Sequence, residues 1–149
     1  MAMIQIPPDF KEFLRLLNSH QVEYLLIGGY AVGYYGFVRA TGDMDIWINI
    51  NTANATNVVA ALKEFGFAVP ELSPKLFLQK DRIIRMGIPP LRLEILTTIS
   101  GVDFTECFEN KLTVQIEDLE VNLINLQDLK VNKRASGRLK DLLDLENLP

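Results

Sequence analysis

Three acidic side chains occupy positions from which they could hold a divalent cation. Asp43 and Asp45 lie two residues apart in the alternating segment 43–50, and Glu94 lies in a second alternating segment, 91–97. Residues two apart in a strand project from the same face, so Asp43 and Asp45 should point the same way. Carboxylates completed by water and substrate phosphates are the ligands that Mg²⁺ prefers. A third carboxylate could complete a two-metal site or accept the proton of an acceptor hydroxyl.

A glycine pair precedes these acids. Gly28-Gly29 follows the apolar run 22–27 and leads into a segment with helical spacing. Unpaired backbone N–H groups at a helix start attract phosphate, and glycines let the phosphate come close. A phosphate-binding turn followed by metal-binding carboxylates describes nucleotidyl transfer, in which an acceptor hydroxyl attacks the α-phosphorus of a nucleoside triphosphate and pyrophosphate leaves.

The composition limits the alternatives. The 149 residues contain one His (His20) and one Cys (Cys107), which excludes an internal disulfide and a Cys/His zinc cluster. A P-loop and a dinucleotide fingerprint both fail on the spacing of the glycines after residue 28. The chain shows neither the pattern of a signal peptide nor an apolar run of about 18 residues, so we expect a cytoplasmic protein that is not in the membrane.

Strands and helices should alternate around these residues. The spacing of apolar residues predicts strands over 22–27, 43–50, 82–87, 91–97, 112–116 and 121–124, and helices over 9–19, 30–37, 52–65, 104–108, 126–135 and 138–148. A hairpin over 82–97 argues against a purely parallel sheet. We therefore expect an α/β (α+β) fold with a mixed sheet flanked by helices and a short C-terminal helical part. The chain should form a single domain over 1–149, with a core over about 1–98 and C-terminal strands and helices over about 99–149.

The stretch YLLIGGYAVGYYGFVRATGDMDIWI resembles the signature of the DNA polymerase β-like nucleotidyltransferase superfamily. The tail LINLQDLKVNKRASGRLKDLLDLENL resembles the C-terminal helices of its small bacterial branch, near the abortive-infection toxin nucleotidyltransferases. The resemblance implies a phosphate-binding turn at Gly28 and Gly29, and metal ligands at Asp43, Asp45 and Glu94. It also points Lys133 towards the triphosphate and places Arg138 and Asp141 in the final helix.

Two positions depart from that signature. Tyr30 occupies the place after the turn where the family usually has Ser or Thr, and the third acid, Glu94, is more often Asp. Including Tyr30, the expected nucleotide-binding residues are Gly28, Gly29, Tyr30, Arg39, Thr41, Lys133 and Arg138. Arg39 could instead pair with the Asp43/Asp45 acids, Glu94 could pair with Arg82, Arg85 or Arg92, and the basic run 130–140 could be a solvated helix face.

The sequence thus predicts a metal-dependent nucleotidyltransferase that uses Mg²⁺, or Mn²⁺, and a nucleoside triphosphate. The acceptor would be a hydroxyl of RNA, of a protein or of a small molecule. The alternative is a catalytically inactive nucleotidyltransferase-fold module for binding or interaction, such as a toxin–antitoxin component whose protein partner is encoded nearby. The base preference, the acceptor and the oligomeric state stay open.

Overall fold

The computed structural model describes residues 4–88 and 90–149, and its elements gather around one mixed sheet. The strands are β1 (Tyr24–Ile27), β2 (Asp43–Ile48), β3 (Ile83–Met86), β4 (Arg92–Leu96), β5 (Leu112–Ile116) and β6 (Leu119–Leu123). Their order in the six-stranded sheet is β3-β4-β2-β1-β6-β5. The pairs β2–β4 and β1–β6 are parallel, and β1–β2, β3–β4 and β5–β6 are antiparallel. The expected mixed α+β architecture is therefore confirmed.

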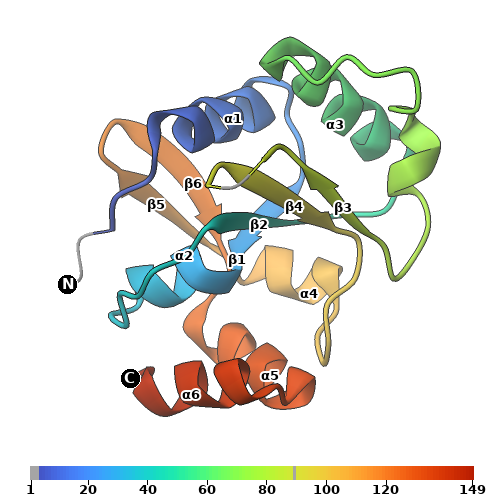
Figure 1. Ribbon diagram of the computed structural model, residues 1–149. Helices are drawn as coiled ribbons and strands as arrows, with labels where there is room; N and C mark the ends of the chain where they lie inside the picture. The colour runs from blue at the N-terminus through green and yellow to red at the C-terminus, as the bar shows by residue number, and fades with distance from the viewer. Residues whose placement is uncertain (1–3, 89) are drawn as a thin grey trace.

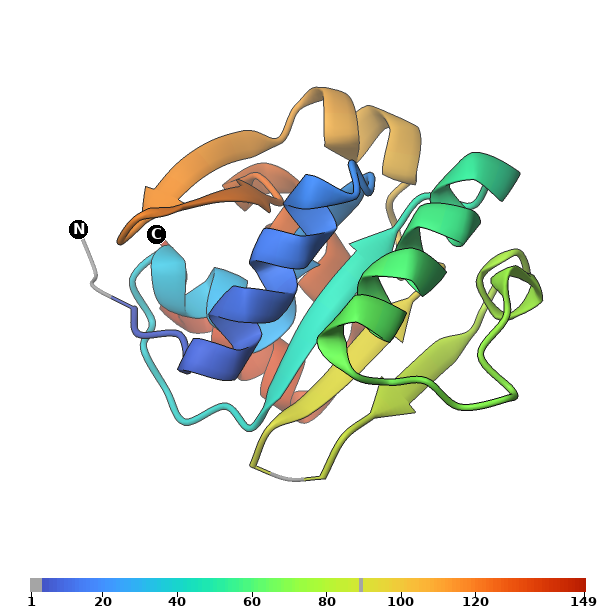
Figure 2. The ribbon, with the colours of Figure 1, turned by 90° about the horizontal axis from the view of Figure 1, so that it is seen from above.

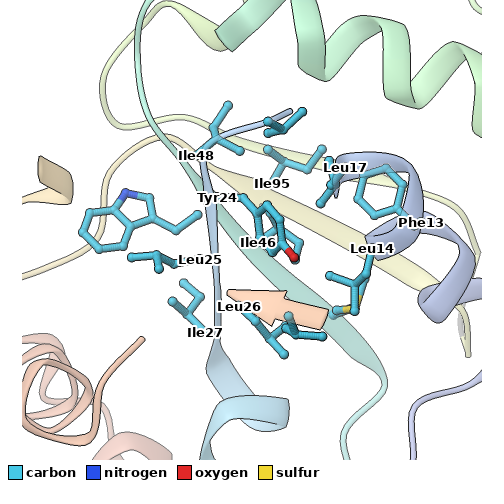
Figure 3. Close-up of a cluster of buried hydrophobic side chains, with 14 of the residues drawn as sticks. Phe13, Leu14, Leu17, Tyr24, Leu25, Leu26, Ile27, Ile46, Ile48 and Ile95 are labelled. Atoms are coloured by element: carbon cyan, nitrogen blue, oxygen red, sulfur yellow. The ribbon is translucent and has the colours of Figure 1, made fainter. Parts of the chain in front are cut away.

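Two helices cover one face of this sheet, α1 (Pro8–Ser19) and α3 (Thr52–Phe65) (Figures 1 and 2). Alternation along β2 directs Met44, Ile46 and Ile48 to this face, and all are fully buried. The close-up in Figure 3 shows Ile46, Ile48 and Ile95 of the sheet beside Phe13, Leu14 and Leu17 of α1. This apolar layer fixes the register of β2 and so directs the alternate residues, Asp43 and Asp45, to the opposite face.

The opposite face is covered only in part, by α4 (Phe104–Glu109), α5 (Leu126–Ser136) and α6 (Leu139–Asn147) (Figure 1). Trp47 lies on the same face as Asp43 and Asp45 but is buried, because the ring of Phe104 packs edge-on against it with the ring centroids 5.0 Å apart. The short helix α2 (Gly28–Tyr34) continues directly from β1. Residues of β2 and β4 and of the C-terminal helices α5 and α6 line a common cleft.

Several element ends differ from the expected ranges. Helix α2 begins at Gly28 rather than at Tyr30, so the glycine pair forms its first turn, and β2 ends at Ile48 rather than at residue 50. The 3₁₀ helix Pro74–Phe77 was not predicted; it buries Phe77 beside α3. In the described ranges, 4–88 and 90–149, no helix combines the length and the apolar character needed to cross a bilayer.

Candidate active site

The three candidate carboxylates lie side by side on neighbouring parallel strands. Asp45 of β2 is the register partner of Glu94 on β4, and Asp43 is the partner of Arg92. Because the backbone pairing of two strands sets these positions, the acids meet without help from any loop. The structure therefore brings together the residues that the sequence analysis expected to act as metal ligands.

Two of these acids are already paired with arginines. Arg92 donates to both carboxylate oxygens of Asp43, from Nε at 3.1 Å and from Nη2 at 2.8 Å. Arg85 of β3 donates from Nε to Oε1 of Glu94 at 2.8 Å. Hydrogen bonding to Arg92 lowers the pKa of Asp43. The alternative in which Glu94 pairs with an arginine of the hairpin is the arrangement observed.

Asp45 has no such counter-charge. Its Oδ1 is buried and lacks a hydrogen-bond partner among the described residues. Burial, followed by the nearby Glu94 and Asp43 carboxylates, raises the pKa of Asp45 to about 7. An acid with a buried, unsatisfied oxygen, set between two other acids, is a place where a cation or a proton would be bound.

The glycine turn is packed against the same carboxylate. Gly28 has a φ of +68°, and a Cβ there would lie 2.2 Å from Oδ2 of Asp45. A Cβ on Gly29 would lie 2.5 Å from Oγ1 of Thr41. Glycine is thus required at both positions, at Gly28 by the backbone conformation and by space, and at Gly29 by space alone.

These elements enclose a cleft of about 660 Å³. Its walls include most of the residues expected to bind nucleotide or metal: Gly28, Gly29, Arg39, Thr41, Asp43, Asp45, Glu94, Lys133 and Arg138. A volume of this size lies within the range of about 300–1,000 Å³ that is usual for small-molecule sites. The basic C-terminal residues and the acids of the sheet therefore share one cavity, which the sequence could not establish.

Within the cleft, the C-terminal cations differ in their availability. Lys133 is buried, and its Nζ lies 3.2 Å from Asp141 and 3.1 Å from Asp144. Its charge is therefore balanced within the protein and is not available to a ligand. Arg138 donates to Asp141 at 2.7 Å, yet 67% of its side chain is exposed. Lys140 also lines the cleft and lowers the pKa of Asp45 through its charge. Arg138 and Lys140 are therefore the C-terminal cations that can reach a ligand; the sequence indicated Lys140 only as part of the basic run 130–140.

Arg39 and Tyr30 contact parts of the protein other than Asp43 and Asp45. Arg39 forms a two-point ion pair with the buried Asp144 of α6, at 2.7 and 2.8 Å, rather than pairing with Asp43 or Asp45. Tyr30 is only 7% exposed, packs edge-on against Phe10 at 5.9 Å and lines a neighbouring pocket instead of the main cleft. Apolar burial in the first turn of α2 explains why a tyrosine is found where a hydroxyl residue was expected.

Three apolar side chains line part of the cleft. Ile83 and Leu96 are register partners that follow the Arg85–Glu94 pair by one step on the same face, and both line the cleft together with Ile99. Ile83 is 49% exposed and lies on the edge strand β3. A ligand held by the carboxylates would meet this apolar shelf (Ile83, Leu96 and Ile99) on the side of Glu94.

The donor set suits Mg²⁺ chemically, but not in the arrangement observed. No group of three His, Cys, Asp or Glu side chains within 4–88 and 90–149 is placed to hold a metal ion as it stands. The unsatisfied Oδ1 of Asp45 is free to act as a ligand, whereas Asp43 and Glu94 are engaged by Arg92 and Arg85. Asp43 and Glu94 would have to leave Arg92 and Arg85 before they could join Asp45 as ligands of a cation.

No protein-family model and no curated protein matches the sequence. Solved structures do match the fold. A protein from Thermotoga maritima, provisionally assigned as a nucleotidyltransferase, aligns with a TM-score of 0.65 and 15% identity, over 95% of this chain and 93% of its own. An antigenic nucleotidyltransferase-like protein from Paracoccidioides brasiliensis aligns with a TM-score of 0.55 and 16% identity, over 91% of this chain and 71% of its own. The chain therefore has the fold of nucleotidyltransferase-like proteins.

Proposed function

We propose that the protein is a metal-dependent nucleotidyltransferase that transfers a nucleoside monophosphate from a triphosphate to a hydroxyl group. One observation carries the proposal: Asp45, with its unsatisfied buried oxygen, lies opposite Glu94 in a cleft that also contains the glycine turn and exposed cations. The similarity of fold to nucleotidyltransferase-like structures supports the same class.

In this proposal the triphosphate lies with its β- and γ-phosphates at Gly28 and Gly29, where backbone N–H groups can donate to them. Arg138 and Lys140 neutralise the phosphate charge from the opposite wall. Mg²⁺ held by Asp45 with Asp43 and Glu94 would polarise the α-phosphate and acidify the acceptor hydroxyl. A new bond forms between the acceptor oxygen and the α-phosphorus, the bond to the bridging oxygen of pyrophosphate breaks, and a carboxylate of the site takes the hydroxyl proton.

The acceptor would enter from the side of Glu94. In-line attack places the acceptor opposite the leaving pyrophosphate, and the apolar shelf lies on that side of the carboxylates. An acceptor with an apolar surface next to its hydroxyl group would suit this shelf. RNA, a protein side chain and a small hydroxylated molecule all remain acceptor classes for the experiment to separate.

A calorimetric titration of Mg²⁺ with each of the four ribonucleoside triphosphates tests the proposal. Wild type should bind at least one triphosphate in a metal-dependent way, and Asp45→Asn should largely lose that binding. Asp118→Asn is the matched control, because Asp118 is exposed in the turn between β5 and β6, away from the cleft. Incubation with labelled triphosphates, total RNA and lysate then identifies the acceptor; no binding of any triphosphate by wild type would refute the proposal.

A second candidate function has its own observation. Helix α6 exposes Leu139 (88%), Leu142 (43%) and Leu143 (53%) while burying Asp141 and Asp144. An apolar helix face of this kind favours a binding or interaction module that keeps the fold without the activity, such as one component of a toxin–antitoxin pair. Absence of triphosphate binding, together with co-purification of a protein that Leu143→Glu no longer retains, would favour this candidate.

A further inference from the structure

We propose that Arg92 competes with the divalent cation for Asp43, so that the metal binds together with the triphosphate and only weakly on its own. The inference rests on the proposed function of the same site. It concerns the order and the coupling of binding, which neither the fold nor the similar structures assign.

The first observation is the geometry of the Arg92–Asp43 pair. Both carboxylate oxygens of Asp43 accept hydrogen bonds from a single guanidinium, at 3.1 and 2.8 Å. The two residues are register partners in the β2–β4 pair, so the sheet holds their backbones at a fixed separation. Two-point pairs of this kind are the stronger class of ion pair. A cation that uses Asp43 must therefore displace a well-formed partner.

The second observation is the charge balance of the site. Glu94 is paired with Arg85 at 2.8 Å and lies 4.0 Å from Nη2 of Arg92. The three carboxylates carry −3 when ionised and the two arginines paired with them carry +2, which leaves −1, and the nearby Lys140 weakens the attraction for a cation further. A lone divalent cation thus meets a site whose attraction is largely cancelled, and Asp45 is the acid that remains free for it.

A triphosphate changes both conditions. Its phosphate oxygens offer a guanidinium the same two-point contact that a carboxylate offers. Arg92 lies beside Glu94, which lines the cleft, so a rotation of its side chain towards the cleft could exchange Asp43 for phosphate. Asp43 would then be free for the metal, and by linkage the metal and the triphosphate strengthen each other's binding by the same factor.

The experiment measures Mn²⁺ binding, because free Mn²⁺ has an EPR signal that is lost when the ion is bound. Wild type, Arg92→Gln and Arg92→Lys are titrated with Mn²⁺ alone and with an α,β-methylene triphosphate analogue, and the analogue titrated without protein gives the share of Mn²⁺ that the triphosphate binds by itself. Arg82→Gln is the matched control: Arg82 is an exposed arginine of the same hairpin, and its guanidinium forms no hydrogen bond or ion pair with the residues that the structure describes, 4–88 and 90–149. Far-UV circular dichroism and thermal melting verify that each variant is folded.

We expect Arg92→Gln to bind Mn²⁺ alone about tenfold more tightly than wild type, with the enhancement by the triphosphate analogue reduced by a similar factor. Arg92→Lys keeps the charge but loses the two-point contact, so it should lie between the two; it decides the matter if Arg92→Gln does not fold. Arg82→Gln should behave as wild type.

Two results would overturn the inference, and they are distinguishable. If wild type binds Mn²⁺ with the analogue but neither Arg92 variant tightens Mn²⁺ binding in its absence, Arg92 does not compete and the proposed function stands. If wild type binds no Mn²⁺ even with the analogue, the proposed function fails and the inference fails with it.

Discussion

Folding disfavours the ionised form of Asp45. Its carboxylate is largely shielded from solvent, the buried Oδ1 has no partner among the described residues, and Glu94 and Asp43 lie beside it. The pKa of Asp45 rises from 3.8 to about 7, so the folded state binds a proton more strongly than the unfolded state does. Asp45 therefore costs no stability near pH 4 and a growing amount as the pH rises towards 7.

It follows that Asp45→Asn should stabilise the protein in the absence of metal. Removing the charge should raise the free energy of unfolding at pH 8 by about 1–3 kcal/mol. The gain should shrink as the pH is lowered from 7 towards 4, where the wild-type carboxyl is protonated. Urea denaturation at several pH values checks this, and a gain that does not depend on pH would show that the buried charge is not its source.

Asp141 shows the opposite behaviour. Burial alone would raise its pKa, but hydrogen bonds from Arg138, Ser136 and Lys133 lower it to about 2. A carboxyl whose pKa falls on folding stabilises the protein above pH 4, and this contribution is lost as the pH falls from about 4 to 2.

We expect Asp141→Asn to destabilise the protein by about 3 kcal/mol at pH 7, because it removes one of the two charges that balance the buried Lys133. The difference between wild type and variant should narrow below pH 4. Asp118→Asn, at an exposed turn, should change stability by less than about 0.5 kcal/mol. Equal effects of the two substitutions would mean that the buried ion network contributes no more than a surface pair.

At the scale of elements, the turn from β1 into α2 has the strictest sequence requirement. Gly28→Ala would place a Cβ 2.2 Å from Oδ2 of Asp45 at a φ of +68°. We expect a loss of about 2–4 kcal/mol in the free energy of unfolding, from backbone strain and the displaced carboxylate together.

Gly42→Ala provides the matched comparison, because a Cβ at Gly42 meets nothing within 4 Å and its φ is not in the left-handed region. Thermal denaturation of both variants at one pH measures the difference. If Gly42→Ala costs as much as Gly28→Ala, the close approach to Asp45 is not what requires glycine in the turn.

The sequence predicted the strands and helices well where periodicity and end signals agreed. Alternation in 43–50 and the Thr52–Phe65 segment ending at Gly66 predicted β2 to within two residues and α3 with its observed bounds, because each has one buried face. The 3₁₀ helix Pro74–Phe77 has no such repeat, and the start of α2 at Gly28 depends on the packing of two glycines against Asp45 and Thr41. Contacts between distant segments decide such features.

The same distinction applies to the candidate site. The grouping of Asp43, Asp45 and Glu94 could be predicted, because strand alternation fixes which residues share a face. The partners of the charged side chains could not be predicted. Arg39 pairs with Asp144, 105 residues away, and Lys133 is buried between two aspartates. A basic run in sequence does not reveal which of its charges is free, and here the exposed ones that line the cleft are Arg138 and Lys140.

At the scale of the whole molecule, one wall of the cleft includes a helix whose buried side chains are charged and not apolar. Helix α6 buries the charged Asp141 and Asp144 and exposes Leu139, Leu142 and Leu143. Its connection to the rest of the protein therefore depends on ion pairs, with Lys133 of α5 and with Arg39 of the loop before β2. Breaking the Arg39–Asp144 pair should loosen one wall of the cleft and leave the sheet intact.

Arg39→Met tests this coupling between distant parts of the chain. We expect amide hydrogen exchange in α6 to accelerate by about 10- to 100-fold, which corresponds to a loss of roughly 1.4–2.8 kcal/mol in local stability. The amides of β2 should keep their protection, since the core between the sheet and α1 is untouched. Arg134→Met, at an exposed arginine of α5, should leave exchange in α6 unchanged. Equal acceleration in α6 and β2 would instead mean that the C-terminal helices and the sheet open as one unit, and that the cleft cannot widen without global unfolding.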